Sequence, residues 1–147
     1  MALDTESFDI LLSTVQLFVR ERLVPAENHL EEHDEVPPEL VEAMKEMGLF
    51  GLTVPEEFGG IGLSVSQEVQ VNFELGRTAP AFRSVFGTNI GIGSQGILMD
   101  GTPEQKAEYL PRVASGELVM SFALTEPDAG SDAASLKTRA ELGGDHY

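Results

Sequence analysis

Residues 120–132 read MSFALTEPDAGSD, and the chain changes character within this stretch. An apolar run enters it, and hydroxyl, carboxylate, proline and glycine residues fill the positions that follow. Pro127 lacks a backbone donor and Gly130 can adopt a positive φ, so the chain is predicted to leave regular structure here. Thr125 and Ser131 add hydroxyls, and the unpaired N–H groups of such a turn can bind an anion. From the residues alone, a ligand-binding loop and a polar β-turn are equally good interpretations.

The residues before this stretch carry the patterns of helices. Apolar side chains recur at helical spacing from Phe8 to Val19, and Pro25 is expected to interrupt that helix. Apart from a weak continuation after Pro25, each expected helix starts at a capping residue or a first-turn proline. The predicted starts are Asp4 or Thr5, Ala26 for a weak continuation, Pro38, Ser64 and Thr102, with Gly48 and Gly116 as stops.

The pattern switches from helix to strand after Gly116. Leu118–Leu124 is typical of a buried strand, and Leu136–Ala140 of a second one. The end of the sequence, ELGGDHY, resembles a hairpin turn with its second strand cut short. We therefore predict a mainly α protein: an N-terminal helical bundle domain over residues 1–117, then the first strands of a truncated β-domain over residues 118–147. We also expect the chain to stop inside a domain.

Composition narrows the class of protein. The chain has 147 residues and no cysteine, which suits one domain and excludes disulfides and thiolate metal sites. Its 25 acidic and 9 basic residues give a net charge of −16, which argues against binding to nucleic acid. The start, MALDTESFD, lacks the basic and apolar regions of a signal peptide, and the apolar stretches are too short to span a membrane. We expect a cytoplasmic protein without membrane contact.

The segment from Phe82 to Met99 carries a single charged side chain, Arg83. A helix without a polar face belongs inside a protein or against a partner. Residues 91–96 within it match G-x-G-x-x-G, the fingerprint of dinucleotide-binding turns. That interpretation needs a long helix after the glycines, and only Ile97–Asp100 follow before Gly101. Close packing of small residues is the better interpretation.

Two other patterns resemble metal-binding motifs, but each lacks residues that the motif requires. His29 and His33 share one helix face, but Leu30 stands where a zinc protease has its glutamate. Glu126, Asp128 and Asp132 lack the glycine and closing glutamate of a calcium loop. We predict no metal site.

As a whole string, Met120–Asp132 followed by Leu136–Thr138 resembles the signature of the acyl-CoA dehydrogenase family. Other stretches agree with that family in order and spacing, so that the resemblance covers nearly the whole chain. They are EMGLFG at 46–51, VPEEFGGIGLS at 54–64, GTPEQK at 101–106 and YLP at 109–111.

The resemblance implies an N-terminal helical domain, a middle β-domain and a C-terminal helical domain. Members bind FAD and oxidise acyl-CoA thioesters: a carboxylate removes the α-proton, and the β-hydride passes to flavin N5. Electrons then pass to an electron-transfer flavoprotein, and members form homo-oligomers. This chain would supply the first domain and the opening strands of the second.

The same resemblance assigns site residues. The cofactor-binding residues would be Phe122, Ala123, Leu124, Thr125, Gly130 and Ser131. Ser131 would lie beside the cofactor's phosphates and the CoA substrate. Gly93 and Ser94 would also contact substrate, because they and Gly96 leave room for an acyl chain. No catalytic residue is expected here, because the family's catalytic glutamate lies in the C-terminal domain.

The chain by itself is therefore predicted to be inactive and to bind FAD weakly or not at all. An exposed face of the Phe82–Met99 segment could drive its dimerisation. Two alternatives stay open: an acyl-CoA oxidase or a related flavoprotein of the same fold, and a non-catalytic helical interaction module. The length and branching of the acyl substrate are not determined by these residues.

Overall fold

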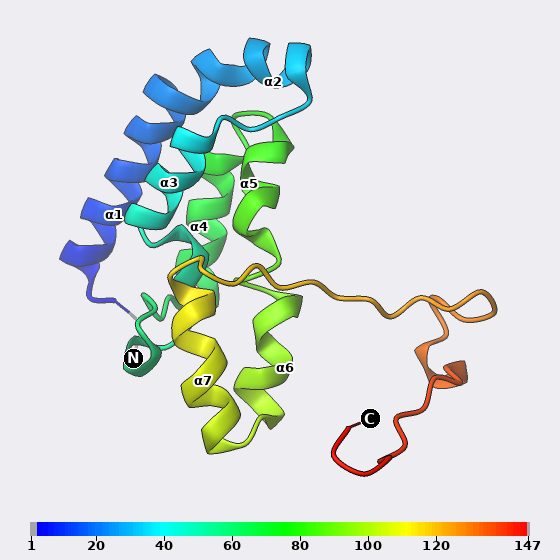
Figure 1. Cartoon of the computed structure of the whole chain (residues 1–147). Helices are drawn as coiled ribbons and strands as arrows, with labels where there is room; N and C mark the ends of the chain where they lie inside the picture. The colour runs from blue at the N-terminus through cyan, green and yellow to red at the C-terminus, as the bar shows by residue number, and fades with distance from the viewer. Residues whose placement is uncertain (1–2, 147) are drawn as a thin grey trace.

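A computed structural model describes residues 3–146 as a body of packed helices with a long extended segment leaving it (Figure 1). The mainly helical fold class is confirmed. The α-helices are α1 (Thr5–Phe18), α2 (Glu27–His33), α3 (Pro38–Glu46), α4 (Val65–Leu75), α5 (Pro80–Gly87), α6 (Ile92–Asp100) and α7 (Pro103–Ala114). None of the helices in the described part of the chain combines the length and hydropathy needed to cross a bilayer.

Helices α1, α4 and α7 begin at the capping residues that the sequence predicts. Asp4 caps α1, with its carboxylate accepting the Ser7 N–H at 3.0 Å. Ser64 with Gln67 forms a reciprocal capping box at α4, and Thr102 with Gln105 forms another at α7. Each box satisfies two N–H groups that a helix start otherwise leaves unpaired.

The long first helix is interrupted near Pro25, as expected. It passes through a π-helical turn at Val19–Leu23 and a 3₁₀ turn at Val24–Ala26 before α2 begins. Proline has no N–H to continue the helical ladder, so the hydrogen-bond pattern shifts around it. The short α2 ends at Asp34, whose φ of 52° is left-handed.

One large core holds α1, α3, α4 and α5 together. The rings of Phe50 and Phe86 lie 6.0 Å apart within it, and both side chains are fully buried. A smaller cluster of Val54, Leu110 and Ala114 joins α7 to the loop before α4. Burial on this scale supplies most of the driving force for folding.

The near-apolar segment from Phe82 to Met99 divides between the core and the surface. Phe82, Phe86 and Ile90 are buried in this chain's own core, whereas Ile92 and Met99 are exposed. The apolar surface expected along the whole segment is therefore restricted to α6. On α4, the apolar residues at 65, 69 and 73 point outward, whereas Val71 and Leu75 enter the core.

The expected strands are not formed within residues 3–146. Leu118–Leu124 is extended but outside any sheet, and Leu136–Ala140 is likewise without a strand partner. Among the described residues, two isolated bridges occur, Glu126 with Ala129 and Gly143 with His146. The second is the turn expected near the end, whose last residue, Tyr147, lies outside the described residues. A strand needs a neighbour to satisfy its N–H and C=O groups, and the described chain offers none here.

Candidate functional site

Asn89 ties the signature segment, residues 120–131, to the helical body. Its side chain is fully buried between α5 and α6. The amide nitrogen donates to the backbone oxygens of Val113 at 3.0 Å and Leu118 at 2.7 Å. The amide oxygen accepts the Met120 N–H at 2.8 Å. One side chain thus joins the end of α7 to the first residue of the signature segment.

Beyond this anchor, residues 121–125 run free in extended form, away from α7 (Figure 1). Their side chains are exposed, including 55% of Phe122 and 38% of Leu124. Within residues 3–146, none of the five N–H groups has a hydrogen-bond partner. The segment therefore presents a row of free backbone donors beside apolar side chains.

The loop that follows is closed by the carboxylate of Glu126. This carboxylate accepts the backbone N–H groups of Lys137 at 2.9 Å and Thr138 at 2.7 Å, and it also accepts the Thr138 hydroxyl. The Glu126 backbone pairs with Ala129 through two hydrogen bonds. One acidic side chain thus closes a loop of a dozen residues that contains Gly130 and Ser131. We call this set of hydrogen bonds from Lys137 and Thr138 to the Glu126 carboxylate the Glu126 clip.

These donors lower the pKa of Glu126 below its ordinary value. The Thr138 hydroxyl contributes most, followed by the N–H groups of Lys137 and Thr138. All three donate to the ionised form and so favour it over the neutral acid. Lys137 also approaches Asp128 across the loop, at 3.5 Å between Nζ and Oδ2.

The predicted cofactor-binding residues meet on this one exposed stretch. Thr125 and Ser131 have hydroxyls without a hydrogen-bond partner among the described residues, and Gly130 is exposed beside Thr125. Free N–H and hydroxyl donors next to Phe122 and Leu124 match a planar ring system with carbonyl acceptors and an anionic tail. The residues present fit one side of FAD, and their role in binding it stays a prediction.

Gly93 and Ser94, predicted to contact substrate, lie on α6 close to the anchor. A Cβ added to Gly93 would sit 2.5 Å from the Met120 Cβ and 2.8 Å from the Thr88 backbone oxygen. Gly93 therefore permits α6 to pack against the signature segment. Ser94 is fully buried, with its hydroxyl 3.5 Å from the Gly91 oxygen. A role for either residue in substrate contact stays a prediction.

The glycine-rich and histidine patterns in the sequence do not form a binding site in the described part of the chain. Glycines 91–96 lie in and just before α6, and no strand precedes them within residues 3–146. The rings of His29 and His33 stack at 4.2 Å on the exposed side of α2. In the part of the chain that the structure describes, no three potential metal ligands of the His, Cys, Asp or Glu type come together.

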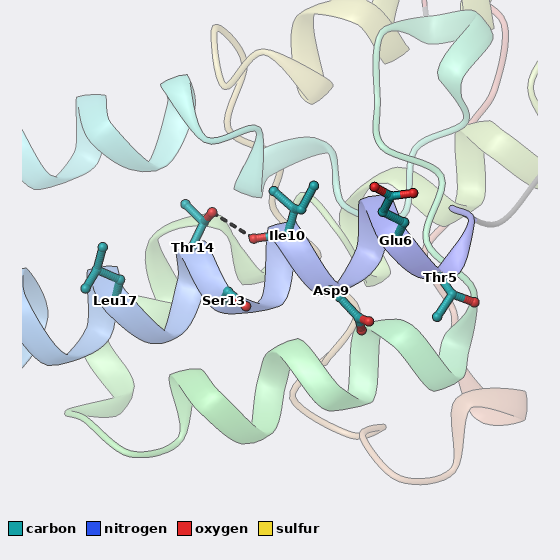
Figure 2. Close-up of a pocket in the computed structure, with 7 residues that line it drawn as sticks. All are labelled: Thr5, Glu6, Asp9, Ile10, Ser13, Thr14 and Leu17. Carbon is teal, nitrogen blue, oxygen red and sulfur yellow. Dashed lines mark hydrogen bonds between the residues drawn. The ribbon is translucent and has the colours of Figure 1, made fainter.

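A shallow hollow of about 700 Å³ runs along α1 (Figure 2). Every residue that lines it comes from that one helix, including Ile10, Thr14 and Leu17. The Thr14 hydroxyl is already engaged with the Ile10 oxygen at 2.8 Å. No group from a second element converges on this hollow, so we do not regard it as the functional site.

Sequence patterns missed the two residues that shape the candidate site. Asn89 is an isolated amide within an otherwise apolar run, and an amide in such a setting needs buried partners. That setting was its one detectable signal. The partners of Glu126 lie eleven and twelve residues further on, in a segment expected to be a strand, so no local pattern indicated the clip.

Comparisons with known proteins agree with this geometry. The family profile described as acyl-CoA dehydrogenase, N-terminal domain, matches residues 5–117. The (2S)-methylsuccinyl-CoA dehydrogenase of Cereibacter sphaeroides is 44% identical over 97% of this chain and 26% of its own length. An acyl-CoA dehydrogenase of Bacillus subtilis is 38% identical over 92% of this chain and 36% of its own.

Solved structures give the same result. The chain is similar to an acyl-CoA dehydrogenase complexed with FAD from Bacillus anthracis, with a TM-score of 0.80 and 36% identity over 96% of this chain and 24% of that one. It is also similar to a glutaryl-coenzyme A dehydrogenase in complex with glutaryl-CoA, with a TM-score of 0.84 and 33% identity over 99% and 38%. The chain thus spans about a quarter to two-fifths of these relatives. Profile, sequence and fold together show that it belongs to the acyl-CoA dehydrogenase family and carries that family's N-terminal domain.

Proposed function

We propose that this chain is the N-terminal portion of an FAD-dependent acyl-CoA dehydrogenase. The whole enzyme would convert an acyl-CoA thioester to the 2,3-enoyl thioester, with loss of the α-proton and the β-hydride. When bound, FAD supplies the hydride acceptor at its N5 atom. The chain's own part in this reaction is binding and orientation.

The extended signature segment carries the proposal. Phe122 and Leu124 offer apolar surface to a flat ring, and the Leu124 N–H and the Thr125 hydroxyl offer donors. Donors that are fixed before reaction stabilise developing negative charge without a cost of reorganisation. The anchor at Asn89 supplies that fixation at one end of the segment, and the Glu126 clip supplies it at the other. Gly130 and Ser131, inside the clip, would face the phosphates of the cofactor or of CoA.

The remaining features of the enzyme follow from the same proposal. Residues 1–117 would form its helical domain, and residues 118–147 would begin its β-domain. Ser131, Gly93 and Ser94 would contact the acyl-CoA, an electron-transfer flavoprotein would accept the electrons, and the subunits would form a homo-oligomer. A role in fatty acid metabolism and a cytoplasmic location belong to the proposal too.

The test uses the full-length protein that carries this chain. We expect it to purify with an FAD spectrum that bleaches when an acyl-CoA is added without oxygen. Thr125→Val should slow bleaching about tenfold or more, since one preorganised donor is lost. Thr14→Val, which changes an exposed threonine of α1, should have no effect. Absence of bound flavin would refute the proposal. Rapid reoxidation of the reduced enzyme by oxygen would identify an oxidase instead.

A further inference from the structure

The short stretch just before residues 121–125 is held by hydrogen bonds at both of its ends. The Leu118 N–H donates to the Arg112 oxygen at 3.0 Å, and the Leu118 oxygen accepts from the Asn89 side chain at 2.7 Å. The Met120 N–H donates to the same side chain at 2.8 Å. The next five N–H groups have no partner in the described part of the chain. The placement of the free segment is therefore decided at Met120.

The Asn89 side chain binds this stretch as a neighbouring strand would. In a parallel pair, a residue donates to one carbonyl of the partner strand and accepts the N–H two residues further on. The Asn89 amide donates to the Leu118 oxygen and accepts the Met120 N–H, which are spaced in that way. The amide thus fixes one edge of the extended chain, the edge that carries the Met120 N–H.

Gly93 fixes the face of the same residue. A Cβ at Gly93 would lie 2.5 Å from the Met120 Cβ, its nearest neighbour, so the Met120 side chain leaves the backbone against α6. In an extended chain, successive side chains point to opposite faces and successive N–H groups to opposite edges. Phe122 and Leu124 therefore share the face of Met120. The Leu124 N–H lies on the edge that Asn89 holds.

Asn89 is itself held in place by its surroundings. It is fully buried in the turn between α5 and α6, and the buried side chains of Phe86 and Ile90 fix that turn in the core. From the loop before α4, the Thr53 hydroxyl donates to the Ile90 oxygen at 2.5 Å. A side chain locked by packing and hydrogen bonds can hold another group to within about 0.5 Å. Asn89 has the rigidity that a positioning residue needs.

We propose that Asn89 is a positioning residue that acts through Met120: it sets the register of residues 121–125 against the flavin ring, and with it the reduction potential of bound FAD. The inference rests on the function proposed above and adds how its donors are aimed. An extended chain that slips by one residue exchanges its faces and its edges. Without Asn89, the Leu124 N–H is no longer held toward the ring, and the negative charge that develops there loses a fixed donor.

The experiment measures the reduction potential of FAD bound to the full-length protein, without substrate, against a reference dye. Asn89→Leu should weaken binding of the reduced form, relative to the oxidised form, about tenfold, which lowers a two-electron potential by about 30 mV. Asn89→Asp keeps an acceptor for the Met120 N–H and should give an intermediate value. Gly93→Ala keeps Asn89 but displaces Met120, and should lower the potential as well.

Two controls separate positioning from stability. Val15→Ala removes methyl groups from a fully buried position on α1, so it lowers stability from within the core. Asn28→Leu changes an exposed amide on α2. Both should leave the potential unchanged. With an acyl-CoA and an artificial electron acceptor, Asn89→Leu should lower kcat and leave KM nearly unchanged, because the lost interaction belongs to the transition state.

The outcomes separate this inference from the proposed function. An Asn89→Leu protein that binds FAD at the wild-type potential overturns the positioning role and leaves the dehydrogenase intact. A potential that falls equally in Val15→Ala assigns the effect to stability, which also overturns the role. Lowered potentials in the Asn89 and Gly93 variants, without turnover of any acyl-CoA by wild type, support the role and refute the dehydrogenase. Wild type without FAD refutes both. If Asn89→Leu does not fold, Asn89→Asp and Gly93→Ala decide by the same criteria.

Discussion

The helical body and the segment after α7 differ in where their apolar side chains and backbone N–H groups find partners. In the body, α1, α4 and α7 start at side-chain caps a few residues away, and the buried residues of α1, α3, α4 and α5 pack into one core inside the chain. In the segment, Phe122 and Leu124 are as apolar as core residues, yet they are exposed. Exposed apolar side chains beside unpaired N–H groups indicate that this surface binds a ligand or another part of the protein. The contrast shows that the body is held together by contacts within the chain. The segment is held only at its two ends, by Asn89 and by the Glu126 clip, and its middle is left to contact a ligand or another part of the protein.

The largest expected effect compares two phenylalanines. Phe86→Ala removes a fully buried ring that packs beside Phe50, and should lower the free energy of unfolding by about 3–5 kcal/mol. Phe122→Ala, at an exposed position, should change it by less than about 0.5 kcal/mol. Urea unfolding of this chain, followed by circular dichroism, measures both. Equal losses would mean that the segment is part of the core, and the comparison would be wrong.

The second-largest effect is expected at Asn89, which joins the body to the segment. Asn89→Ala leaves two carbonyls and the Met120 N–H without their partner, at a cost of about 2–4 kcal/mol. The exposed Asn28 on α2 provides a matched control, Asn28→Ala, which should be nearly neutral. Hydrogen exchange sharpens the test, since the Met120 amide should lose protection in Asn89→Ala alone. A Met120 amide that stays protected would show that the segment is held by other means.

The sequence predicted the body far better than the segment, for physical reasons. Caps at Asp4, Ser64 and Thr102 and stops at Gly48 and Gly116 act over a few residues, so their patterns are readable without a structure. The strand at Leu118–Leu124 depends on a neighbour, and a β-like pattern cannot supply one. The likeness of the signature to a known family located the candidate site, but the partners of the buried Asn89 amide, 24 to 31 residues further along the chain, are visible only in the structure.

A smaller effect tests the local rules of the body. Ser64→Ala removes the side-chain acceptor of the α4 capping box and should cost about 1 kcal/mol. Ser13→Ala, in the exposed middle of α1, serves as its control and should be neutral or slightly stabilising. Thermal unfolding compares the two variants. If both behaved alike, the start of α4 would be fixed by packing and not by its cap.

The smallest effect is confined to the Glu126 clip. The lowered pKa of Glu126 means that folding favours its ionised form. The clip is therefore intact at neutral pH and opens as the pH falls below the ordinary glutamate pKa and through the lowered one. The amide resonance of Thr138 should report this transition. Glu126→Gln should show the opened state already at pH 7, whereas Glu141→Gln, at an exposed position, should not. A transition midpoint at or above the ordinary glutamate value would contradict the clip.

The central claim is that the free donors of residues 121–125 form one wall of the flavin site. Hydrogen exchange of the full-length protein, with and without FAD, measures those five amides directly. The account predicts strong protection of residues 121–125 on binding FAD, with no change in the middle of α1. Saturation with FAD that leaves these amides exchanging as fast as before would contradict it.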